Sequence, residues 1–134
     1  MSGFGVYSAT TYNNSQLGFA SPALTVNGVT ANHQVLISIV GQISPPNNTT
    51  ECFISFDSPD AGGVAASDNR SINVIGTSGL PATNIQIQYG VTYLVTAPLT
   101  GANHFNVDVR SYTSTGSNDT TCSYNNVSIV GVPF

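Results

Sequence analysis

Short runs of alternating apolar and polar residues recur along the chain. The clearest run spans residues 105–110, where Phe105, Val107 and Val109 alternate with polar residues. Successive side chains of a β-strand point to opposite faces, so this run predicts a half-buried strand with these three residues facing inward. Residues 84–89 repeat the same alternation and predict a second strand of this kind.

Other apolar runs predict further strands with a less regular alternation. Residues 35–43 and 91–97 are apolar on both faces for part of their length, and residues 52–57 have a partly apolar second face. Shorter or weaker candidates lie at residues 5–12, 24–29, 71–75 and 127–130. Gly, Pro, Asn, Asp and Ser cluster between the runs and predict turns at residues 41–48, 58–63, 76–81, 98–103 and 114–119, with a tight corner at Tyr89–Gly90.

The spacing of these signals indicates the fold class. Turn signals recur at intervals of roughly 8–12 residues, and no window has a convincing helical period of apolar residues. The sequence therefore predicts an all-β fold, an antiparallel β-sandwich in the form of a jelly roll of about eight strands. A chain of this length can bury one core, so we expect a single domain over residues 1–134. Residues 1–15 are expected to form an extended N-terminal arm.

Charge is scarce, and this excludes several classes of function. Only 6% of the residues are charged, with two arginines, no lysine and a net charge of -4. Nucleic-acid binding needs a basic face, and a polybasic membrane anchor needs clustered cations, so we expect neither kind of partner. No apolar run approaches the roughly 20 residues that span a bilayer. The first residues lack the pattern of a secretory signal, so synthesis in a host cytoplasm is expected.

The apolar strands also lack charged residues that would protect exposed sheet edges. Soluble β-domains commonly place lysine or other charges at such edges. Residues 35–40 have no charged neighbour in the sequence. We therefore predict that contacts between subunits cover part of this surface, and that the protein is a homo-oligomer.

The two cysteines, Cys52 and Cys122, permit one disulfide. In the reducing cytoplasm expected above, a better interpretation is two buried thiols that pack as small apolar side chains. A zinc site is not favoured, because the only further soft donors are His33 and His104.

No pattern predicts catalytic, cofactor-binding or metal-binding residues, so we expect no enzyme activity and no cofactor. The densest acidic patch is residues 57–60 with Asp68, which could bind Ca²⁺ through oxygen atoms. The same Asp, Ser, Pro and Gly residues are typical of a turn, and we favour that interpretation. His33 and His104 each precede a predicted strand, where hydrogen bonding within a loop is the simplest role.

Candidate interface residues come from rare charges and from aromatic side chains. Arg110 shares a strand face with Asp108, and it either anchors a subunit or ligand contact or forms an exposed pair worth less than about 1 kcal/mol. Tyrosines could stack on sugar rings, but packing in the core or an interface is favoured because tyrosine is common in strands. The aromatic interface candidates are Phe4, Tyr7, Tyr12 and Tyr112.

Three stretches in the C-terminal half carry a resemblance to a known group of proteins. They are residues 90–96 (GVTYLVT), 105–112 (FNVDVRSY) and 127–133 (VSIVGVP). Their strand rhythm and the closing I-V-G-V-P resemble small trimeric jelly-roll modules of bacteriophage head decoration (cement) proteins and fibre heads, with a distant likeness to tumour-necrosis-factor-like domains. The resemblance covers about a third of the chain, and the N-terminus departs from it. It implies a β-sandwich protomer, three-fold assembly and attachment to a larger particle, with no catalytic residues.

These observations together predict a structural protein of a bacteriophage. We expect a homotrimeric decoration or cement subunit on the capsid surface of the virion, bound across the boundaries of the major capsid protein. The alternative is a receptor-binding fibre or tail tip, in which loops such as residues 114–119 bind a host glycan.

Overall fold

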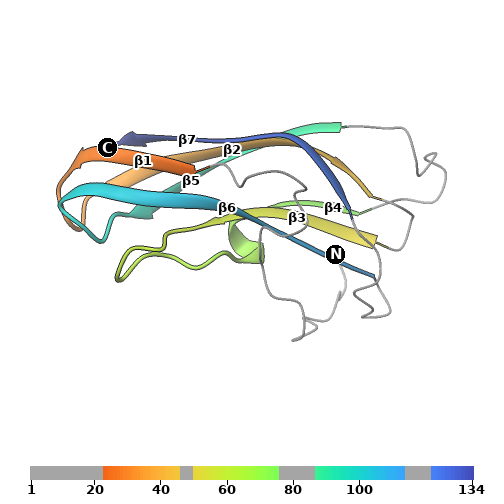
Figure 1. Cartoon of the computed structure of the whole chain (residues 1–134), viewed down its shortest axis with the longest axis horizontal. Coiled ribbons are helices and arrows are strands. Elements are labelled where there is room, and N and C mark those ends of the chain that lie inside the picture. The colour runs from red at the N-terminus through yellow and green to blue at the C-terminus, as the bar shows by residue number, and fades with distance from the viewer. Residues whose placement is uncertain (1–22, 46–49, 76–86, 114–121) are drawn as a thin grey trace.

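The computed structural model of the chain describes residues 23–45, 50–75, 87–113 and 122–134. The strands in these residues are β1 (Ala23–Val29), β2 (Gln34–Ser44), β3 (Thr50–Asp57), β4 (Ile72–Ile75), β5 (Ile87–Thr96), β6 (Gly101–Thr113) and β7 (Ser123–Pro133), and η1 (Asp68–Arg70) is a 3-10 turn. A four-stranded sheet of order β1-β6-β3-β4 lies against a three-stranded sheet of order β5-β2-β7 (Figure 1). All pairings are antiparallel, which confirms the predicted β-sandwich. The described residues contain seven strands where about eight were expected, and the jelly-roll connectivity stays a prediction.

The core lies between the two sheets and follows from the alternation in the sequence. Phe105, Val107 and Val109 of β6 are buried, as predicted for residues 105–110. Phe56 of β3 lies near Phe105 and near Tyr93 of the opposite sheet, with ring centroids 6.3 and 6.1 Å apart. Aromatic contacts of this kind add to the burial of apolar area and hold the two layers in one arrangement.

The connection from β3 to β4, residues 58–71, lies over the outer face of the four-stranded sheet. Ser55 points outward from β3, and its hydroxyl donates to the carbonyl oxygen of Arg70 (2.7 Å) and accepts from the backbone N–H of Ser67 (3.1 Å). Asp60 accepts hydrogen bonds from the backbone N–H of His104 (2.6 Å) and pairs with its Nδ1 (2.9 Å). This cover explains why Ser55 is buried although it faces away from the core.

Two predicted boundaries are wrong. The corner at Tyr89–Gly90 does not exist, because β5 runs straight through these residues and pairs them with Gly41 and Val40 of β2. The long β2 partner imposes strand pairing that the local sequence does not reveal. The turn expected over residues 98–103 is shorter, since β6 begins at Gly101 and His104 therefore lies inside the strand. Residues 84–86 of the predicted strand fall outside the described residues.

Cys52 and Cys122 form a disulfide, so the prediction of two free thiols is wrong. Cys52 lies on β3 of the four-stranded sheet, and Cys122 immediately precedes β7 of the three-stranded sheet. Their Cα atoms are 6.0 Å apart, and both residues are almost completely buried. The prediction failed because it rested on the expected compartment, whereas the fold brings the two side chains together between the sheets.

Gly131 marks the place where β7 approaches β1 across the edge of the sandwich. A Cβ atom at this position would lie 2.7 Å from Cδ2 of Leu24 and 2.8 Å from Cγ2 of Val26. The missing side chain lets β1 close over β7 and seal that edge of the core. The other surface of β7 is left facing outward.

Candidate interaction surface

The outer face of the three-stranded sheet is the candidate functional surface, and we call it the uncharged face. Its three rows follow from the strand register, in which Leu36, Ser38 and Val40 of β2 each pair with one residue of β5 and one of β7. The nine residues that define the face are Leu36, Leu94 and Val132, then Ser38, Thr92 and Val130, then Val40, Gly90 and Ser128. None of them carries a charge.

This face holds exposed apolar side chains. The large hydrophobic residues that are exposed within the described part of the chain are Leu94 (46%), Val130 (56%), Val132 (57%) and Phe134 (78%). The first three belong to the uncharged face. The backbone N–H of Phe134 donates to the carbonyl oxygen of Gln34 (2.9 Å), which holds the last residue beside β2. Contiguous exposed apolar groups on a soluble domain are typical of interaction sites.

Two of the three hydroxyl groups of the uncharged face are paired with each other. The hydroxyls of Ser38 and Thr92 lie 2.8 Å apart and form a hydrogen bond across β2 and β5. Just beyond the face, the amide of Asn126 donates to Oε1 of Gln42 (2.8 Å). A polar group that already has a partner loses little when water is removed, so covering this face carries a low desolvation cost.

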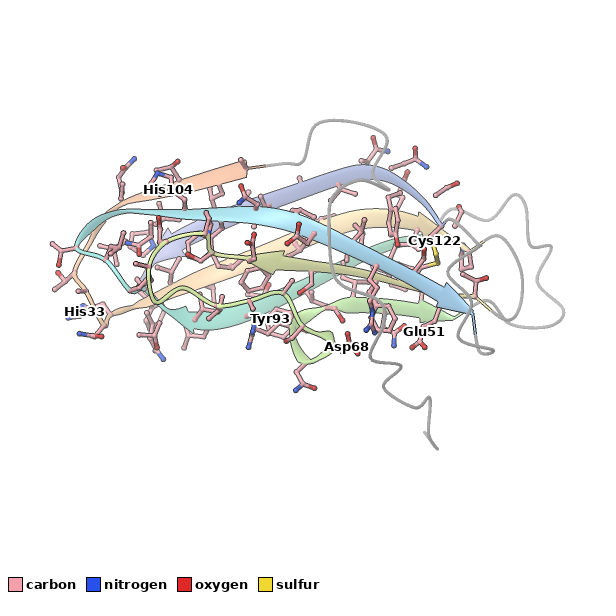
Figure 2. All side chains as sticks on the ribbon, turned by 60° about the horizontal axis from the view of Figure 1, so that its bottom comes forward. His33, Glu51, Asp68, Tyr93, His104 and Cys122 are labelled. Atoms are coloured by element: carbon pink, nitrogen blue, oxygen red, sulfur yellow. A yellow bond between two sulfur atoms is a disulfide. The ribbon has the colours of Figure 1, made fainter. Side chains whose placement is uncertain are left out.

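The acidic groups of the described residues are on the other side of the sandwich. Figure 2 shows His104 and Asp68 on the four-stranded sheet and its covering connection. Five of the six acidic residues are in the described part of the chain, and all five lie on that sheet or connection: Glu51, Asp57, Asp60, Asp68 and Asp108. The uncharged face therefore carries no charge, whereas the opposite side of the sandwich carries the described acidic residues.

Arg110 is a buried structural residue rather than an exposed one. Only 7% of its side chain is exposed, and its guanidinium lies 4.3 Å from the ring centroid of Phe53. Its Nη2 donates to Oδ2 of Asp68 (2.8 Å), which ties the η1 turn to β6. The sequence suggested either an outside partner or an exposed pair with Asp108, and the observed ion pair with Asp68 is neither.

The remaining predicted interface residues are only partly placed. Phe4, Tyr7 and Tyr12 lie outside the described residues, as does the whole of the predicted arm. Tyr112 lies on β6, where it pairs with Glu51 of β3 through the backbone ladder. Of the predicted interface residues, Tyr112 and Arg110 lie within the described part of the chain, two positions apart on β6. The residues that sequence reasoning missed are Leu94, Val130 and Val132, although the apolar second face of residues 91–97 was a usable signal.

Tyrosines in the described residues take part in packing and hydrogen bonds. Tyr124 is buried, and its hydroxyl donates to the carbonyl oxygen of Arg110 in the opposite sheet (2.9 Å). The hydroxyl of Tyr93 donates to the carbonyl oxygen of Ser71 (3.2 Å), and its ring packs against the core. Burial raises the pKa of Tyr124 well above its usual range, with smaller opposing effects from a backbone hydrogen bond of Phe53 and the charge of Arg110.

The fold separates the acidic residues that the sequence offered as a possible Ca²⁺ site. Asp60 is bound to His104, and Asp68 is paired with Arg110 on a different part of β6. Within the described ranges, no three His, Cys, Asp or Glu side chains are grouped so that they could hold a metal ion. These ranges also contain no helix with the length and apolar character needed to cross a membrane.

Asp108 is the carboxyl group most affected by its surroundings. Burial, and then the negative charge of Asp57, raise the pKa of Asp108 to about 6. Burial also raises the pKa of Asp57, while a hydrogen bond from the Asn106 side chain acts in the opposite direction. Between the pKa of an unfolded aspartate, about 3.9, and the folded value, the native state binds more protons than the unfolded state. The stability that Asp108 contributes is therefore present below that window and is lost as the pH rises through it.

Replacing Asp108 with asparagine is expected to stabilise the protein at neutral pH. The Asp108→Asn variant cannot ionise, so it avoids a half-buried negative charge beside Asp57. We expect the Tm to rise by about 3 °C near pH 7.5, since solvent screening limits the gain to about 1 kcal/mol, and the difference should vanish near pH 4. Calorimetric scans across this pH range measure both effects.

Asp60→Asn is the matched control, because it makes the same charge change but is expected to have the opposite effect on stability. Burial acts to raise the pKa of Asp60, but the backbone and side-chain hydrogen bonds of His104 lower it overall. Asp60→Asn should therefore lower the Tm at neutral pH. Equal shifts of the same sign in both variants would show that net charge, and not the local environment of Asp108, sets the pH dependence.

Comparisons with known proteins leave the uncharged face as the main guide to function. Neither the scan against protein-family models nor the search of curated proteins finds a match for this chain.

Proposed function

We propose that this chain is a structural subunit of a virus particle, a decoration or cement protein on a bacteriophage capsid. The observation that supports it most is the uncharged face, with Leu94, Val130 and Val132 exposed and two of its three hydroxyl groups already paired. Such a surface suits a permanent contact between subunits, because covering it removes apolar area from water without burying a charge. The proposal includes the finer expectations of a jelly-roll connectivity and a trimer.

The proposed mechanism is thermodynamic and uses no catalysis. A cement protein binds a site that exists only where neighbouring capsid proteins are in place. Its binding free energy is therefore added to the stability of the assembled shell and is lost when the shell separates. In this proposal the predicted arm, residues 1–15, contacts the major capsid protein, and the sandwich itself lies on the outside of the virion.

Particles that lack this protein are expected to release their genome at a lower temperature and under milder osmotic shock than complete particles. The binding energy of many subunits stabilises the intact shell only while they are bound. Fluorescence of a nucleic-acid dye during heating measures the release. Adding the purified protein back should restore the resistance of the particles.

The control for this experiment is the same protein after irreversible heat denaturation, which should restore nothing. Equal heat and osmotic resistance with and without the native protein would contradict the cementing role. Failure of the native protein to co-sediment with particles would contradict attachment itself.

A further inference from the structure

We infer that the partner of the uncharged face is a second copy of this chain. The inference rests on the proposed function, which takes this face as a permanent contact between subunits, and it identifies the molecule that covers the face. Three observations carry it: the size of the face, the side of the molecule on which the charges lie, and the state of the polar groups on the face.

The outer face of the whole three-stranded sheet, with the uncharged face at its centre, is large enough for a specific contact. β2 has 11 residues and β5 has 10, and the two are paired over ten positions. Three strands about 4.8 Å apart, with ten residues at about 3.3 Å each, cover roughly 500 Å². Two such faces in contact remove roughly 1,000 Å² from water, which is the lower limit for a specific protein interface.

The distribution of charge favours a second copy over a charged partner. The chain has a net charge of -4, and its described acidic residues lie on the four-stranded sheet or on the connection that covers it. Two copies that meet through the uncharged face keep these carboxylates on opposite outer sides of the assembly. A contact through the four-stranded sheets would instead bring like charges together, which is unfavourable.

Most of the hydroxyl groups on the face do not require a hydrogen-bonding partner on a second molecule. Ser38 and Thr92 already bond to each other, and Ser128, in the last row of the face, carries the one further hydroxyl. The apolar side chains of Leu94, Val130 and Val132 therefore provide the attraction, and a second copy presents the same side chains. If both copies use the same patch, the contact forms a symmetric dimer. If one copy uses one part of the face and its neighbour uses an adjoining part, the contacts form a ring, as in the predicted trimer.

Sedimentation velocity of the isolated full-length protein tests the inference without particles. We expect the wild-type protein to self-associate between about 1 and about 100 µM. Val130→Asp should weaken this association at least about 100-fold, because the new carboxylate would be buried without a partner. Leu94→Asp is the second variant, and it places the same charge on the other edge strand of the face.

Thr25→Asp is the matched control, because Thr25 is an exposed strand position on β1 of the four-stranded sheet. It adds the same charge elsewhere and should leave self-association unchanged. Circular dichroism verifies that each variant is folded. A wild-type protein that stays monomeric up to the highest concentration overturns the inference, as does equal association of Val130→Asp, Leu94→Asp and Thr25→Asp.

Co-sedimentation with particles separates this inference from the proposed function. A monomeric wild-type protein that binds particles overturns the second copy and keeps the proposed role in the virion. An oligomer that dissociates in Val130→Asp but never binds particles keeps the inference and removes the proposed role in the virion.

Discussion

Replacing both Cys52 and Cys122 with alanine is expected to lower the free energy of unfolding by about 4 kcal/mol. The disulfide joins residues 70 positions apart, so it removes a large part of the conformational freedom of the unfolded chain. It also links β3 to the start of β7, one strand from each sheet. Urea titrations of the oxidised wild-type protein and of Cys52→Ala/Cys122→Ala, both without reductant, measure the difference.

Reductant provides the control for this prediction. The double variant should give the same urea midpoint with and without dithiothreitol, whereas the wild-type midpoint should fall when reductant is present during unfolding. Both sulfur atoms are buried, so the folded wild-type protein should keep its disulfide in reductant alone. Two thiols titrated in the wild-type protein after denaturation without reductant would contradict the disulfide.

The disulfide changes what is expected of the protein's surroundings. Disulfides persist in oxidising environments, and reducing systems in a cytoplasm keep most thiols free. A chain made in a host cytoplasm would then close this bond after leaving it. The proposed position on the outside of a virion provides such an oxidising setting, and a cross-link between the two sheets would resist loss of structure there.

Much of the fold could be predicted because single strands leave a local pattern. Residues 105–110 alternate cleanly, and β6 buries the three residues expected from that alternation. Pairing between distant strands leaves no such pattern. β2 aligns Gly90 with Val40 and extends β5 through a dipeptide that resembles a corner, while the fold brings Cys52 to Cys122 across 70 positions.

The sequence indicated that a candidate surface exists, but not which residues form it. Apolar residues on both faces of residues 35–43 and 91–97 indicated that two surfaces were to be covered. Which residues would face outward depended on the register of β2 with β5 and β7, which placed Leu36 beside Leu94 and Val132. Scarce charge suggested unprotected strands, but it did not show that the acidic residues gather on one sheet.

Arg110 illustrates the opposite case, in which the strand pattern was correct but its interpretation was incomplete. Alternation placed Arg110 on the outer face of β6, and an outer face was equated with exposure. The connection of residues 58–71 has no periodicity that would reveal its course, yet it brings Asp68 against the guanidinium. Burial of this arginine was therefore a consequence of tertiary structure alone.

Replacing Arg110 with alanine is expected to lower the free energy of unfolding by about 2–3 kcal/mol. The change removes the ion pair with Asp68 and the contact of the guanidinium with the ring of Phe53, and it leaves a space where the side chain was buried. Because Asp68 is partly exposed, it can be hydrated after the change, which keeps the loss below that of a fully buried pair. Urea titration measures the loss, and limited proteolysis within residues 58–71 shows whether the connection is released.

Arg70→Ala is the matched control, since Arg70 is the other arginine and its Nη2 donates to the carbonyl oxygen of Ala65 within the same connection. Arg70 is only half-buried, so this change should cost less than about 1 kcal/mol. A double-mutant cycle of Arg110→Ala with Asp68→Asn isolates the ion pair, and Arg110→Lys tests the planar contact with Phe53. Losses of equal size in Arg110→Ala and Arg70→Ala, with no coupling to Asp68, would mean that packing of the connection does not depend on Arg110.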